Sequence, residues 1–328
     1  MAEPLRATFF ALKRRDRMVL LPATLVMLVA VGLLFAAFVA LNWGFFSQIQ
    51  TLIQSGAEMP EGDNATFAFG IMATVFGGFL FLFPAYMVIA AYEAACLRWM
   101  IRGEVRGLFG LSFDHDMWRV YGVYWCWVIA QFTLSMVMGI LMMPLSLMMM
   151  SEMVAASSEP TSDAWWNLQM RMQGLSLLQY IPLLYFGIRL GPAAATSIAR
   201  KRFSFFDAWI VTRERFWALF GSHAVWVLIL AVFWIAPVIY LLFVGFGGSW
   251  QAIAESSNWQ GSPEEAQERF RAVWERIATP SFLTQVAAGY AIMIATSVVW
   301  YLMSYGINAR AALAALDEGK ISVQPSDD

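Results

Sequence analysis

The chain has 328 residues and a formal net charge of −2, and 60% of its residues are hydrophobic whereas only 13% are charged. Soluble domains carry about 25% charged residues, and a mean hydropathy of +0.61 leaves more apolar surface than a water-soluble fold can bury. The composition therefore excludes soluble, disordered and collagen-like proteins. The two cysteines, Cys96 and Cys126, cannot form the framework of a disulfide-rich secreted domain.

Six apolar stretches are long enough to cross a bilayer as helices, for which about 20 residues suffice. They cover residues 18–46, 66–97, 118–150, 175–199, 217–246 and 282–316. None shows the alternation of barrel strands, and lipid-exposed backbone must satisfy its own hydrogen bonds. The sequence thus predicts an all-α polytopic membrane protein with an amphipathic arm (1–17), a transmembrane domain (18–316) and a short tail (317–328).

The basic residues are distributed unevenly between the two ends of these spans. Of the 21 lysines and arginines, 17 lie in the arm, the tail, the two connections that precede spans three and five or the parts of the spans next to them, and four lie on the opposite side. Because basic residues concentrate in cytoplasmic loops, we expect both termini in the cytoplasm. The loops near Gly56, Ser157 and Trp259 are then expected outside.

The spans are predicted to form three repeated helix hairpins. The segment from Trp118 to Gly122 aligns with the segment from Trp217 to Gly221, and each opens an odd-numbered span. The even-numbered spans each end in a run of small residues, at 90–95, 191–195 and 309–315. Small residues allow helices to approach closely in lipid, so the even-numbered spans are expected to meet near a shared centre on the cytoplasmic side.

Two further segments are predicted as amphipathic helices at the membrane surface. Ser204 to Asp207 has the pattern of a capping box, and the helix after it should lie at the interface and lead into span five. On the outer side, Pro263 begins a segment with an acidic first turn, and its apolar residues repeat at helical spacing up to Ile277.

Glu93, Arg189 and Arg310 form a candidate intramembrane polar centre. Each lies within or at the inner edge of an even-numbered span, where a charge is costly and tends to face the bundle interior and to pair. We expect Glu93 to lie close to Arg189 or Arg310. Such a pair is either a substrate or proton site or a structural ion pair between repeats, and the sequence leaves both open.

Methionines crowd the outer end of span three. They are Met142, Met143, Met148, Met149, Met150 and Met153. Thioethers are soft ligands that suit Cu(I), but methionine is also a flexible apolar residue that fills irregular gaps. Without cysteine or histidine on that side, packing is the expected role, and we predict no metal site.

The remaining polar clusters do not predict catalytic chemistry. Asp114, His115 and Asp116 lie together before Trp118, where such residues cap the next helix. The sequence has no nucleotide-binding glycine loop, nucleophile elbow or zinc-binding helix motif. Its basic residues flank the membrane spans instead of forming a nucleic-acid patch. We therefore predict no catalytic residue, no cofactor and no nucleic-acid partner.

With its three hairpins, its small-residue run from Gly191 to Ala195 and its segment from Arg213 to Gly221, the chain resembles bacterial six-span membrane proteins. One such family is the membrane domain found N-terminal to glycerophosphodiester phosphodiesterases. Only a short tail follows Leu316 here, so phosphodiesterase activity is not expected. The resemblance implies a bacterial inner-membrane location and a non-catalytic role.

The expected function is that of a non-enzymatic integral membrane protein that organises or binds other membrane components, with membrane lipids and other membrane proteins as candidate partners. One alternative is a transporter or channel for a small substrate, since internal repeats and intramembrane charges are typical of transporters. A second alternative is a membrane-embedded enzyme. A polar cavity open to one side would favour transport, and a dry, filled centre would favour the non-enzymatic function.

Overall fold

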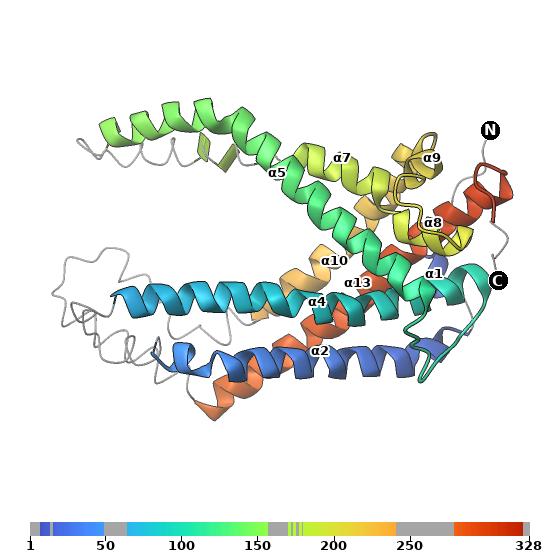
Figure 1. The fold of residues 1–328 in the computed structure, drawn as a ribbon, viewed down its shortest axis with the longest axis horizontal. Coiled ribbons are helices and arrows are strands. Elements are labelled where there is room, and N and C mark those ends of the chain that lie inside the picture. Colours follow the sequence, from blue (N-terminus) through green and yellow to red (C-terminus); the bar gives the residue numbers. More distant parts are fainter. Residues whose placement is uncertain are drawn as a thin grey trace. The chain divides into compact units, whose positions relative to one another are not determined.

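The computed structural model describes residues 7–13, 16–48, 64–156, 170–171, 173–174, 177–178, 180–240 and 279–323. Within these residues the protein is all-α (Figure 1). Six of its helical segments are long and apolar enough to cross a membrane. The prediction of a polytopic protein with six membrane-spanning helices is therefore confirmed, and the threefold repeat stays a prediction.

The helices begin and end close to the predicted boundaries. In chain order they are α1 (Phe10–Lys13), η1 (Arg17–Leu20), α2 (Leu21–Leu41), α4 (Asn64–Arg102), α5 (His115–Ala156), α7 (Tyr180–Leu190), α8 (Ala193–Arg200), α9 (Ala208–Thr212), α10 (Phe216–Tyr240) and α13 (Pro280–Asp317). Proline lies inside both α4 and α5, and each helix continues through it.

Span four is interrupted, whereas the sequence predicted one continuous helix over 175–199. α7 and α8 lie on either side of Gly191 and Pro192. Proline has no N–H with which to continue α7, and its carbonyl accepts the backbone N–H of Thr196 at 2.8 Å as α8 begins. Gly191 leaves no room for a side chain, because a Cβ there would lie 2.7 Å from the carbonyl oxygen of Gly187.

The chain divides into two compact units. Unit 1 contains the described parts of residues 1–10, 90–222 and 305–328, and unit 2 contains those of 11–89 and 223–304. The long helices α4, α10 and α13 contribute residues to both units.

The core of unit 1 is built from small residues. The alanines in the runs 90–95, 193–199 and 309–315 are at most 7% exposed. Helices in lipid gain no hydrophobic free energy by associating, so close approach through small side chains supplies much of their packing. The burial of all three runs in one unit agrees with the packing role that the sequence predicted for them.

In unit 2, α2 contacts the first part of α4. The ring of Phe38 lies 5.4 Å from that of Phe81, edge to face. The side-chain oxygen of Asn42 accepts a hydrogen bond from the hydroxyl of Thr74 at 3.1 Å. Many other large apolar side chains of these two helices are exposed, as is expected of surfaces that face lipid.

The sequence predicted one interfacial helix leading into span five, but this helix is interrupted. A turn at 213–215 separates the short helix α9 from α10. The capping box is not formed either: the hydroxyl of Ser204 is buried without a hydrogen-bond partner, and the carboxylate of Asp207 pairs with Arg200 instead. The predicted outer helix over 263–277 and the three expected outer loops lie outside the described residues.

The start of the C-terminal tail folds back onto this turn within unit 1. Glu318 forms an ion pair with Arg215, and the ammonium of Lys320 binds the carboxylate of Glu214. Ile321 is buried. The tail is therefore attached up to this point, which the sequence had not predicted.

Candidate functional site

Glu93 is buried on α4, and its partner is a tyrosine. It is 6% exposed, and its Oε2 accepts a hydrogen bond from the hydroxyl of Tyr124 on α5. Among the ion pairs of the described residues, none joins Glu93 to Arg189 or Arg310. Arg310 lies half-buried on α13. The expected pair is not formed, because a neutral hydroxyl satisfies the carboxyl group without a second buried charge.

Tyr124 belongs to a cluster of three tyrosines next to this carboxyl group. Tyr305 on α13 lies beside the hydroxyl of Tyr124. The ring of Tyr305 is 6.5 Å from that of Tyr92, edge to face. Cys96, one turn after Tyr92 on α4, is fully buried. Residues from α4, α5 and α13 thus form one buried polar cluster within unit 1, and the sequence had not predicted its tyrosines.

Arg189 occupies a different environment at the end of α7. Its guanidinium carbon lies 5.5 Å from the ring of Tyr185, 5.1 Å from that of Trp209 and 5.2 Å from that of Phe216. Its Nη1 donates to the carbonyl of Thr212 at 3.1 Å, and the hydroxyl of Thr212 donates back to its carbonyl at 3.1 Å. Cation–π contacts stabilise an arginine that lies against aromatic rings. These contacts join α7 to α9 and to the start of α10.

A network of arginines and aspartates joins α4 to the start of α5. Arg98, which is fully buried, forms an ion pair with Asp114. Asp116 lies between two cations, 2.8 Å from Arg102 and 2.7 Å from Arg119. Arg102 also donates to a backbone carbonyl at the end of α8. Because buried charges are costly unless they are paired, this network fixes the end of α4 against the start of α5.

Asp114 caps α5, as the sequence predicted. Its Oδ1 accepts the backbone N–H of Met117 at 3.2 Å, and its Oδ2 accepts the hydroxyl of Ser112 at 2.9 Å. Partial burial acts to raise the pKa of Asp114, but the charge of Arg98 and these hydrogen bonds outweigh it, and the pKa lies below its usual value. Its carboxylate is therefore a structural group that stays ionised at neutral pH.

The methionines of α5 do not converge on one point. Met149 is buried, whereas its neighbours Met148 and Met150 are exposed, as is expected of consecutive residues on a helix. The side chain of Met153 lies outside the described residues. In the part of the chain that is described, no group of three or more histidine, cysteine, aspartate or glutamate residues is placed to hold a metal ion.

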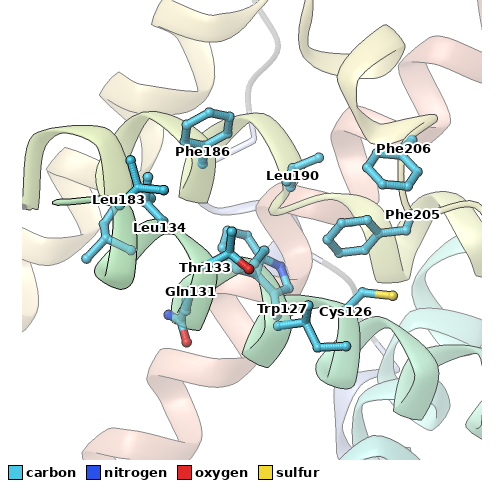
Figure 2. Close-up of a pocket in the computed structure, with 13 residues that line it drawn as sticks. Cys126, Trp127, Gln131, Thr133, Leu134, Leu183, Phe186, Leu190, Phe205 and Phe206 are labelled. Atoms are coloured by element: carbon cyan, nitrogen blue, oxygen red, sulfur yellow. The ribbon is translucent and has the colours of Figure 1, made fainter. Parts of the chain in front are cut away.

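An apolar groove of about 460 Å³ lies between α5 and α7 in unit 1 (Figure 2). Residues between 126 and 137 of α5 form one wall, and Leu183 and Leu190 of α7 lie on the other. Phe205 and Phe206, from the loop before α9, close one end. The groove is therefore built from two membrane-spanning segments and one connection between spans.

The lining of this groove is aliphatic and aromatic, with Gln131 and Thr133 as its polar side chains. The ring of Trp127 contacts that of Phe205 edge to face, 6.4 Å between centroids, which fixes the closed end. Cys126 is half-buried and lines the groove. Such a surface can accept a flexible apolar chain and offers little to a polar one.

No protein-family model, curated protein or solved structure matches this sequence. The polar cluster and the arginine–aspartate network are paired internally and connect helices. The groove, by contrast, is open to a ligand.

Proposed function

We propose that this chain is a non-enzymatic integral membrane protein that binds a lipid acyl chain in the groove between α5 and α7. The observation that carries the proposal is the almost wholly apolar lining of a groove formed by two membrane-spanning segments. An acyl chain is the apolar ligand that surrounds such segments in a bilayer. Its transfer from lipid brings no hydrophobic gain, so the binding free energy comes from dispersion contacts with a fixed surface.

The internal pairing of the charged residues supports a non-enzymatic function. The carboxylate of Asp116 is held by Arg102 and Arg119, and that of Glu93 by Tyr124. A general acid, base or nucleophile must instead reach a substrate. These two carboxylates connect helices, and neither lines the groove.

Filling the groove with a side chain tests the proposal. Ala130 lines the groove, and Ala130→Trp should displace the acyl chain. Ile140→Trp on the same helix is the matched control, because Ile140 is 67% exposed and lies outside the groove. Native mass spectrometry of the purified protein counts retained phospholipids: Ala130→Trp should retain one fewer than the wild type, and Ile140→Trp the same number. Equal retention by all three proteins would contradict the proposal.

The proposal includes a bacterial inner-membrane location with both termini in the cytoplasm. The six candidate spans among the described residues support termini on one side, and the uneven distribution of basic residues supports the cytoplasmic side. A single cysteine at position 56, in a variant without Cys96 and Cys126, should react with a membrane-impermeant maleimide in intact spheroplasts. Reaction only after the membrane is opened would reverse the orientation.

Transport is a second candidate function, and one observation favours it. Span four is interrupted at Gly191 and Pro192, and interrupted spans are typical of transporters, where they form substrate sites. Liposomes that contain the purified protein distinguish the two functions. Lipid binding predicts that they hold a proton gradient as well as empty liposomes do, whereas a protein-dependent leak would favour transport.

A further inference from the structure

We propose that the start of the C-terminal tail, residues 318–322, is a strap that holds the connection between α8 and α9 in place and so fixes the closed end of the groove. This inference rests on the proposed function, because it assigns a segment that prepares the groove for its lipid. It is carried by a continuous series of contacts from the tail to the residues that line the groove. The strap, the connection and the groove all belong to unit 1.

The end of α13 sets the direction of the strap. Gly319 has a φ of 69°, a left-handed conformation that glycine adopts without strain. Its backbone N–H donates to the carbonyl of Leu316 at 3.0 Å, and that of Lys320 donates to the carbonyl of Ala315 at 2.9 Å. These two hydrogen bonds form a Schellman motif. The chain therefore turns back at a fixed point after α13 ends at Asp317.

Charges and one apolar side chain attach the strap within unit 1. The ammonium of Lys320 binds the carboxylates of Glu214 and Glu318. Glu318 also pairs with Arg215, so the strap is attached to the turn between α9 and α10. Ile321 is 4% exposed. Because exposed ion pairs are individually weak, the burial of this side chain is expected to contribute most to the attachment.

Arg200 joins the strap to the connection between α8 and α9. The backbone carbonyl of Ser322 accepts a hydrogen bond from Nε of Arg200 at 3.3 Å. Nη1 of the same arginine forms an ion pair with Asp207. In the sequence Asp207 directly follows Phe205 and Phe206, which line the groove. Release of the strap therefore removes a hydrogen bond from the arginine that holds the residue next to the closed end.

A fixed closed end favours the binding of an acyl chain. The binding free energy comes from dispersion contacts with a surface that is already ordered, and any ordering of side chains during binding lowers the affinity. With the strap released, binding must also order Phe205 and Phe206. The strap thus couples the C-terminal tail to the affinity of the groove.

Ile321→Asp tests the strap, because a charge at this buried position should release it. Hydrogen–deuterium exchange in peptides covering residues 203–215 should be about tenfold faster, since burial of an isoleucine favours the attached state by at least this factor. Peptides covering α4 should exchange as in the wild type, which excludes general unfolding. The variant should also retain less phospholipid than the wild type in native mass spectrometry.

Val323→Asp is the matched control, because it places the same charge in the same tail at a position that is 52% exposed. It should exchange and retain lipid as the wild type does. Lys320→Gln removes the ion pairs of the strap without placing a charge in a buried site. It should show faster exchange and lower retention to a smaller extent than Ile321→Asp.

The outcomes separate this inference from the proposed function. Unchanged exchange, or unchanged lipid retention, in both Ile321→Asp and Lys320→Gln would overturn the strap, and loss of lipid from Ala130→Trp would leave the groove intact. Retention of no lipid by the wild type would contradict the proposed function. Faster exchange in Ile321→Asp would then still support the attachment of the connection by the tail.

Discussion

The hydroxyl of Tyr124 donates a hydrogen bond to the carboxyl group of Glu93, and this contact joins α5 to α4 inside unit 1. The two residues lie at the same depth in their helices. Glu93 is nine residues before the end of α4 at Arg102, and Tyr124 is nine residues after the start of α5 at His115. An acid and a hydroxyl can therefore meet inside the span without an ion pair.

Glu93→Ala should lower the free energy of unfolding by about 1–3 kcal/mol, because the hydroxyl of Tyr124 loses its acceptor in a buried site. Tyr124→Phe should lower the free energy of unfolding by a similar amount. The decrease in the double variant should be smaller than the sum of the two single decreases. Glu93→Gln should have the smallest decrease in the free energy of unfolding, since its amide oxygen still accepts the hydrogen bond. Thermal unfolding in detergent measures these changes.

Arg189→Ala provides the control for this pair. It shares no hydrogen bond or ion pair with Glu93, so its effect should add in full to that of Glu93→Ala. Strong coupling between Glu93 and Arg189, with none between Glu93 and Tyr124, would contradict the geometry.

The stability of the protein should fall in acid because of Asp114. Its pKa is lowered in the folded protein, so its contribution is fully present above the pKa of the unfolded chain, about 3.9. The contribution is lost as pH falls from there through the lower folded pKa. Asp114→Asn should be less stable at neutral pH, and its unfolding temperature should fall less steeply below about pH 4.

Asp317→Asn is the matched control for the acid profile, since Asp317 is an exposed aspartate at the end of α13. Its unfolding temperature should follow that of the wild type at every pH. An Asp114→Asn profile parallel to the wild type would show that the cap does not determine acid stability.

Replacing two glycines of span four with alanine should have opposite effects on the stability of the protein. Gly191→Ala should destabilise by about 1–3 kcal/mol, because its Cβ would lie 2.7 Å from the carbonyl oxygen of Gly187. Gly187→Ala should stabilise by about 0.5–1 kcal/mol, because a Cβ there meets nothing within 4 Å and alanine favours a helix. Chemical unfolding of both variants measures the difference, and equal effects would contradict the close approach at Gly191.

Arg189→Lys should lower stability by about 1–2 kcal/mol although it keeps the charge. The planar guanidinium contacts three aromatic rings and binds the carbonyl of Thr212, and an ammonium cannot reproduce this stacking. Arg213→Lys, at an exposed position, should leave the unfolding temperature unchanged. If both variants had the same unfolding temperature, the planar shape of the guanidinium would contribute nothing to stability through the aromatic contacts.

The sequence predicted features that depend on neighbouring residues alone. The six spans follow from local composition, because any apolar run of sufficient length must cross the membrane as a helix. Asp114 caps the helix that begins beside it, so its role could also be predicted. Gly191 and Pro192 did not by themselves predict the interruption of span four, because proline is often tolerated within spans. α4 and α5 both continue through one.

Only the tertiary structure decided which residues meet within unit 1. Charge alone suggested arginine as the partner of Glu93. The equal distance of Glu93 and Tyr124 from the ends of their helices, at Arg102 and His115, became visible only in the structure. The groove had no signal in the sequence either. In a soluble helix an apolar stripe marks the face that turns inward, whereas a membrane span is apolar on every side because lipid and protein interior are equally apolar. The sequence therefore determined that these helices cross a membrane. How the helices pair, and where they leave a groove, depends on the shape and spacing of their side chains, and composition does not distinguish one face of a membrane-spanning helix from another.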